Sequence, residues 1–210
     1  GLIRHVTGRG VGDVWREDIA DPFGIDYHIG LNDAEAARRA DFVETPGTPS
    51  RDGIKGDAES PLTRAWNPMP RDEDFNSEGW VRGSFASANG HGNARAIAKL
   101  YSGLAGDGTI DGRQLLSKEL IADAISEHWD DMDRMTNRPF RFGCGFMLSC
   151  DAFPFGGRRK NFGHTGIGGA IGFGDPDRGL GFSYCGNRMA PIANTGPFGG
   201  PLIDAAYAAI

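Results

Sequence analysis

The sequence has few of the residues that build metal centres. Its three cysteines, Cys144, Cys150 and Cys185, form no C-x-x-C pair and no zinc-type spacing. An odd number leaves at least one thiol free, which favours a reducing compartment such as the cytoplasm. The five histidines show no H-x-H or H-x-x-x-H pairing. The sequence therefore gives no support to a metal site.

Long apolar runs and an excess of positive charge are also absent. The formal net charge is −6, which argues against nucleic acid or an anionic membrane surface as partner, because both are bound through a basic face. No apolar stretch is long enough to span a bilayer. Residues 1–5 have no signal-peptide character and no start methionine, so an upstream region is expected to be missing.

The overall composition is that of a soluble globular domain. Hydrophobic residues make up 39% of the chain and charged residues 24%, which argues against wholesale disorder. Glycine is the outlier, at 33 of 210 residues. So much glycine without a collagen-like period predicts many turns or places where two backbones approach closely.

Helical periodicity and breaker residues predict helices in the first half of the chain. A short helix is expected over 11–20, ended by Asp21-Pro22. A second helix is expected over 34–39, capped by Asn32-Asp33. From 44 to 78 the chain is polar, contains five prolines and shows little periodicity. Such an excursion either covers a functional surface or is a solvated insertion, and the sequence leaves both open.

The second half changes from helix to strand patterns. A helix is expected from Gly92 or Asn93 to 103–106, then a compact hairpin-like element within 107–112 and a helix capped by Ser117. Strand-like segments follow at 140–148, 161–165, 170–174 and 179–185, before a closing helix at 202–207. This order predicts an α+β fold, with an antiparallel sheet flanked by helices.

One segment, His164-Thr165-Gly166-Ile167, combines groups that bind a substrate with a group that stabilises negative charge. A histidine supplies charge or exchanges a proton near neutral pH, and a threonine hydroxyl donates to a ligand carbonyl. Glycine lets a substrate lie close, and the N–H that follows it can point at a developing oxyanion. Taken alone, so short a motif is weak evidence of function, because glycines at a strand end usually mark only a bend.

The sequence around His164 resembles the Lys-Thr-Gly strand of serine β-lactamases and penicillin-binding proteins, in whose esterase relatives histidine often replaces the lysine. Further segments match the same family in the expected order: Val6-Thr7-Gly8-Arg9, Asp18 to Ile25, Gly30-Leu31, Asn89 to Ala98 and Gly108 to Ser117. The resemblance is to the class C β-lactamase-related esterases and covers nearly the whole chain. It implies a β-lactamase-like fold that is incomplete here.

The departure from the family concerns its nucleophile. The family's chemistry needs a Ser-x-x-Lys pair, in which a lysine one helical turn away activates the serine. The residues three positions before the lysines here are Asp52, Ala96, Leu115 and Gly157. No tyrosine is followed two positions later by asparagine or serine, so the Tyr-x-Asn motif is absent too. The resemblance therefore implies that residues 1–210 are the carboxy-terminal portion of one β-lactamase-related domain, with an irregular insertion at about 44–78.

The expected function follows from that resemblance. The complete enzyme would cleave an ester or amide through a serine acyl-enzyme, with His164, Thr165 and Gly166 binding substrate and the Ile167 N–H donating to the oxyanion. No metal or organic cofactor is implied, and this chain is expected to be inactive alone. The alternatives are a non-catalytic member of the same fold that binds a ligand or partner, and an unrelated α+β domain.

The resemblance also implies two structural features, an uncovered sheet edge and a strand edge that faces a cleft. The missing region would leave a sheet edge and apolar surface uncovered, which predicts self-association or marginal stability unless a partner covers them. The strand carrying residues 164–167 is expected to present its outer edge to a cleft, unpaired by another strand.

Overall fold

The computed structural model describes residues 1–45, 57, 59–66, 74–135, 137–190 and 196–210. Its helices are α1 (Leu2–Thr7), α2 (Val11–Trp15), the π-helical turn η1 (Arg16–Ala20), α3 (Asp21–Phe23), α4 (Asp33–Ala36), α6 (Pro61–Trp66), α7 (Glu78–Arg82), α8 (Ala94–Ala105), α9 (Lys118–Ala124) and α10 (Gly196–Ala208). Its strands are β1 (Tyr27–Ile29), β2 (Gly90–Gly92), β3 (Thr109–Ile110), β4 (Arg113–Gln114), β5 (Trp129–Asp133), β6 (Arg138–Phe142), β7 (Met147–Leu148), β8 (Phe162–Thr165), β9 (Ile171–Asp175) and β10 (Leu180–Tyr184).

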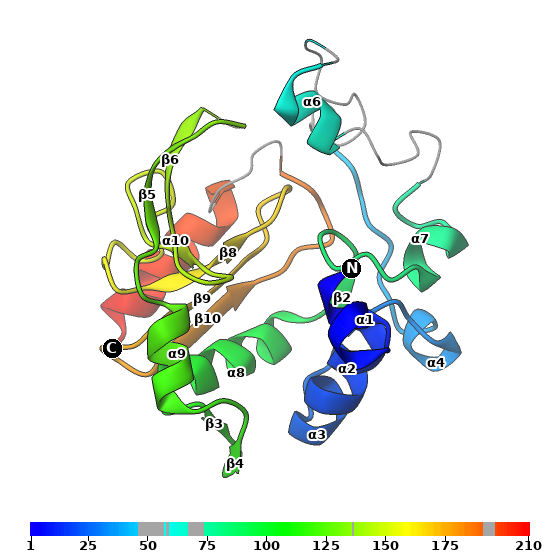
Figure 1. Cartoon of the computed structure of the whole chain (residues 1–210), viewed down its shortest axis with the longest axis horizontal. Coiled ribbons are helices and arrows are strands. Elements are labelled where there is room, and N and C mark those ends of the chain that lie inside the picture. The colour runs from blue at the N-terminus through cyan, green and yellow to red at the C-terminus, as the bar shows by residue number, and fades with distance from the viewer. Residues whose placement is uncertain (46–56, 58, 67–73, 136, 191–195) are drawn as a thin grey trace.

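The central feature is a six-stranded antiparallel sheet in the order β10-β9-β8-β7-β6-β5. Helices α8 and α10 cover its opposite faces (Figure 1). The alternation of side chains along β9 assigns these faces, since Ile171 and Phe173 pack with Ile203 of α10. The predicted α+β architecture, an antiparallel sheet flanked by helices, is confirmed.

Glycines on the other face of the sheet explain how closely α8 packs. A Cβ added to Gly181 would lie 2.1 Å from the carbonyl oxygen of Ala98, and one added to Gly172 would lie 2.6 Å from Ile97. Neither position can carry a side chain without pushing the helix away. Part of the unusual glycine content therefore serves the contact between the sheet and α8.

Several predicted elements form as expected because their local signals are strong. The Asn93 side chain accepts from the Ala96 N–H and caps α8, and Ser117 caps α9 in the same way. Asp111 and Gly112 adopt φ 50° and 78° between β3 and β4, the backbone of a two-residue hairpin turn.

Two boundaries differ from the prediction. The helix over 11–20 does not end at Asp21-Pro22: it continues through η1 into α3 and ends at Gly24, whose φ is 58°. Pro22 is tolerated there because it lies in the first turn of α3. The single strand expected at 140–148 is two strands, β6 and β7, because the chain turns through Gly145 at φ 86°.

The sequence interpretation missed the elements with weak or mixed patterns. These are α1, the two-stranded β1–β2 ribbon and the edge strand β5, whose residues are mostly charged. Most of the predicted insertion at 44–78 lies outside the described residues, namely 46–56, 58 and 67–73. Its described part contains α6 and the first residue of α7.

The cysteines are all free thiols, and Cys144 and Cys185 are exposed. No helix in the described part of the chain has both the length and the apolarity needed to cross a membrane.

Candidate functional site

The predicted site residues form the end of β8 and the turn that joins it to β9. The Gly166 N–H donates to the Ala170 carbonyl oxygen at 2.7 Å, and the Gly169 N–H donates to the Gly166 oxygen at 3.1 Å. Gly168 and Gly169 have φ values of 94° and 93°, a conformation that side-chain-bearing residues rarely adopt. The glycine run after His-Thr-Gly is therefore what lets the chain reverse here.

The two halves of β8 have different neighbours. β9 pairs with all four residues, whereas β7 reaches only Phe162 and Gly163. Phe162 and Gly163 therefore lie inside the sheet, whereas the expectation of an unpaired outer edge concerns residues 164–167. In the described chain His164 and Thr165 pair with β9 alone, because β7 is only two residues long.

His164 is exposed to solvent, so it is no core histidine. Its Nδ1 lies 2.6 Å from the carbonyl oxygen of Thr165. Because a carbonyl oxygen only accepts, Nδ1 carries the proton in this contact, and Nε2 is left to act as acceptor or to take up a second proton. The hydrogen bond from Nδ1 to the Thr165 carbonyl oxygen thus fixes the orientation of the ring.

Thr165 and Gly166 differ in how much space surrounds them. Thr165 is 8% exposed and lies opposite Ile171 on the α10 face. Among the described residues, a Cβ added to Gly166 would meet only Ala170, at 3.5 Å, which is ordinary van der Waals contact. These residues therefore leave space beside the backbone at Gly166.

The Ile167 N–H has no hydrogen-bond partner in the part of the chain that the structure describes, although the amides at Gly166 and Gly169 both do. The residue is half-buried in the turn. A backbone N–H that has no partner among the described residues, on a turn fixed by its neighbours, is available as a hydrogen-bond donor.

A second segment supports this turn, and the sequence interpretation did not anticipate it. The Ala190 N–H donates to the Gly168 oxygen at 2.9 Å, and the Met189 side chain packs against Gly168. The Met189 N–H in turn donates to the Val43 oxygen at 2.9 Å. We call Val43 and residues 187–190 the buttress. No local pattern in the sequence indicates it, because it joins residues about 145 positions apart.

A buried network fixes the other end of β8. Asn161, fully buried, donates from Nδ2 to the Phe155 carbonyl oxygen at 2.6 Å and to the Tyr207 hydroxyl at 2.7 Å. That hydroxyl donates to Asp175 Oδ2 at 2.8 Å. Burial, followed by the hydrogen bond to the Asp175 carboxylate, raises the pKa of Tyr207 to about 12. This network ties β8 and β9 to α10.

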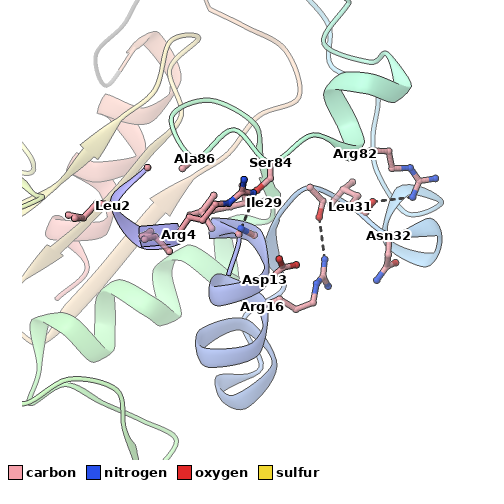
Figure 2. Close-up of a pocket in the computed structure, with 16 residues that line it drawn as sticks. Leu2, Arg4, Asp13, Arg16, Ile29, Leu31, Asn32, Arg82, Ser84 and Ala86 are labelled. Atoms are coloured by element: carbon pink, nitrogen blue, oxygen red, sulfur yellow. Dashed lines mark hydrogen bonds between the residues drawn. The ribbon is translucent and has the colours of Figure 1, made fainter. Parts of the chain in front are cut away.

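A large hollow lies elsewhere, between α1, α2 and the residues that follow β1 and α7 (Figure 2). Its volume is about 830 Å³, and none of residues 164–167 lines it. We call it the amino-terminal hollow. It is separate from the turn that carries the candidate chemistry.

Two of the three described lysines have partners of their own. Lys99 donates to the Phe23 carbonyl oxygen and pairs with Asp111, and Lys160 pairs with Asp177. The chain thus brings together the substrate-strand residues of the predicted site.

Comparison with known proteins places this geometry in context. A family model described as Beta-lactamase matches residues 1–197. The esterase/beta-lactamase LipL of Mycobacterium tuberculosis (strain ATCC 25618 / H37Rv) is 31% identical over 206 residues, which are 93% of this chain and 47% of that protein. The chain therefore spans about half the length of this relative.

Two solved structures also match this chain over about half of their own length. A penicillin-binding protein homologue from Caulobacter crescentus is 35% identical with a TM-score of 0.87, covering 100% of this chain and 55% of that one. A family VIII carboxylesterase is 31% identical with a TM-score of 0.83, covering 99% of this chain and 54% of that one. In both, as in LipL, close to half of the relative has no counterpart here.

Proposed function

The chain belongs to the beta-lactamase family, and from that premise we propose that it is the carboxy-terminal portion of a serine hydrolase that cleaves an ester or amide through an acyl-enzyme. In this proposal His164, Thr165 and Gly166 form the strand along which the substrate lies. The Ile167 N–H is one oxyanion donor. The serine and its lysine belong to the half of the fold that this chain does not contain.

The proposed reaction requires the turn after β8 to stabilise negative charge on the substrate oxygen. The serine oxygen bonds to the substrate carbonyl carbon while its proton passes to the neighbouring base, and the carbonyl π electrons move onto oxygen. The Ile167 N–H and the N–H of the serine stabilise that negative charge. Collapse breaks the bond to the leaving group, which takes the proton, and water then attacks the acyl-enzyme to release the acid.

The observation that carries the proposal is that the Ile167 N–H has no partner among the described residues, and that these residues leave space beside Gly166. A donor that is fixed before the substrate arrives costs no reorganisation during the reaction, which is why such donors contribute strongly to catalysis. The buttress and the two glycines at positive φ supply that fixation.

We favour small uncharged esters as the substrate class. In the neutral form His164 holds its Nδ1 proton against the Thr165 carbonyl and brings no full positive charge to the site. A lysine at this place would be charged throughout the neutral range and would attract a substrate carboxylate. The names of LipL and of the family VIII carboxylesterase support an ester-cleaving relative.

The purified chain alone is expected to remain unlabelled by a fluorophosphonate probe and to hydrolyse no p-nitrophenyl acetate. Stoichiometric labelling at one serine of this chain would overturn the placement of the nucleophile outside it. The positive test is co-expression with the part of the Caulobacter crescentus homologue that has no counterpart here, followed by the same two assays.

Gly166→Val is the matched variant for that test. A branched side chain at Gly166 occupies the space proposed for the substrate, so hydrolysis by the co-expressed pair should be abolished while folding is nearly unchanged. His164→Ala should lower turnover more than it lowers stability. A pair that forms and binds esters without ever being labelled would favour the alternative, a non-catalytic ligand-binding member of the fold.

A further inference from the structure

The N–H of Ile167 and the carbonyl oxygen of Gly166 belong to the same peptide group, so the direction of one fixes the direction of the other. A trans peptide group is planar, and its N–H and C=O bonds point in opposite directions. The Gly169 N–H donates to the Gly166 oxygen at 3.1 Å. This hydrogen bond holds the Gly166 oxygen toward the inside of the turn and therefore directs the Ile167 N–H outward.

The same relation holds in the peptide group between Gly168 and Gly169. The Gly169 N–H shares that group with the Gly168 carbonyl oxygen, which accepts from the Ala190 N–H at 2.9 Å. The hydrogen bond from Ala190 therefore fixes the direction of the Gly169 N–H, and through it the direction of the Ile167 N–H. Ala190 belongs to the buttress, so the buttress is connected to the candidate oxyanion donor through the backbone.

The turn needs this connection because its own backbone resists rotation only weakly. Gly168 and Gly169 have φ values of 94° and 93°, and glycine reaches many other conformations at nearly the same energy. Rotation of the peptide group between them would break the hydrogen bond to Gly166 and leave the Ile167 N–H without a fixed direction. The Ala190 N–H opposes that rotation, since it holds the oxygen of the same peptide group.

Residues 43–45 hold the peptide group that carries the Ala190 N–H. The carbonyl oxygen of that group belongs to Met189 and accepts from the Thr45 hydroxyl, while the Met189 N–H donates to the Val43 oxygen at 2.9 Å. Met189 is 4% exposed, and a Cβ added to Gly168 would lie 3.0–3.3 Å from three of its side-chain carbon atoms. Met189 is thus fixed by its backbone on one side and packs against the turn on the other.

We propose that Thr45 is a positioning residue of the oxyanion donor, and that its hydroxyl sets the direction of the Ile167 N–H through three peptide groups in series. The inference rests on the proposed function, which makes this N–H the donor. In each of the three groups the carbonyl oxygen accepts one hydrogen bond and the N–H points at the next acceptor. Hydrogen bonds in such a chain polarise one another, so the series also strengthens the final N–H as a donor.

Amide hydrogen exchange of the ¹⁵N-labelled chain, measured by NMR without substrate, tests the positioning role. The Gly169 amide reports opening of the hydrogen bond to Gly166, and the Phe173 amide, in the doubly paired strand β9, reports global stability. Thr45→Val replaces the hydroxyl with a methyl group of similar size. It should raise the ratio of the Gly169 to the Phe173 exchange rate at least about fivefold, because the Met189 oxygen loses this donor.

Thr45→Ser is the matched control, since it keeps the hydroxyl, and it should leave the ratio within about twofold of the wild type. Should Thr45→Val fail to fold, Met189→Ala takes its place. This variant removes the side chain that lies against Gly168 and should also raise the ratio at least about fivefold. Met189→Leu, which conserves the side-chain volume, is then the control and should stay within about twofold.

The outcomes separate this inference from the proposed function. An unchanged ratio in Thr45→Val, equal acceleration of both amides, or the same rise in Thr45→Ser overturns the positioning role. A rise confined to Thr45→Val supports it. Because no substrate is present, a supporting ratio can coincide with a co-expressed pair that hydrolyses no ester, which contradicts the proposed function alone. An unchanged ratio with an active pair overturns the positioning role alone.

Discussion

Gly163 and Gly166 lie three residues apart, one inside β8 and the other just beyond it, and their surroundings are opposite. A Cβ at Gly163 would lie 2.2 Å from the Gly172 carbonyl oxygen and 2.6 Å from the Phe173 Cβ, whereas one at Gly166 would meet only ordinary contacts among the described residues. Among the described strands, β7 and β9 both pair with the inner half of β8, whereas β9 alone pairs with the outer half. The same residue type thus serves packing inside the strand, and just beyond its end it leaves space among the described residues.

The largest effect on stability is expected from a substitution at the inner end of β8. Phe162 is fully buried and contacts Tyr101 and Phe146. Phe162→Ala should lower the free energy of unfolding by about 3–5 kcal/mol, because it removes buried apolar area and leaves a cavity. Urea denaturation measures this. A loss below about 1 kcal/mol would mean that the inner half of β8 is not part of the core.

The two glycines give the sharpest pairwise test. Gly163→Ala should cost about 1–3 kcal/mol, since its new methyl group meets backbone that cannot move freely. Gly166→Ala should change stability by less than about 0.5 kcal/mol. The comparison fails if both variants lose equal stability in the same denaturation experiment.

The network at the base of β8 should have a smaller, pH-dependent effect. Tyr207→Phe removes the hydroxyl that donates to the buried Asp175 carboxylate, at a cost of about 1–3 kcal/mol near neutral pH. The pKa of Tyr207 is raised from 10.0 to about 12, so the folded state holds this proton more tightly than the unfolded chain does. The stability contributed by that shift is fully present below pH 10 and is lost as pH rises through 12.

Thermal denaturation between pH 8 and pH 12 checks this expectation. Tyr27 and Tyr101 also have raised pKa values because they are buried, and they contribute to the alkaline loss of stability in every variant. The part due to Tyr207 is the difference between the wild type and Tyr207→Phe. Parallel stability curves for the two proteins over this range would contradict the assignment.

Local signals in the sequence were enough for the elements that position the site. The helix start at Gly92 or Asn93 and the cap at Ser117 were predicted, because a capping residue acts through its own backbone neighbourhood. The buttress could not be predicted, since Val43 and Met189 meet only in the folded chain. The double pairing of Phe162 was missed because nothing local fixes where β7 ends.

The central claim is that the outer end of β8 presents a free amide to a ligand, and amide hydrogen exchange measured by NMR tests it most directly. Gly166 and Ile167 are adjacent, and the N–H of Gly166 is bonded to the Ala170 oxygen at 2.7 Å while that of Ile167 has no partner among the described residues. The Ile167 amide should exchange at least about 100-fold faster than the Gly166 amide, each corrected for its intrinsic rate. Equal protection of the two amides would show that the Ile167 N–H is already hydrogen-bonded and would contradict its role as an oxyanion donor.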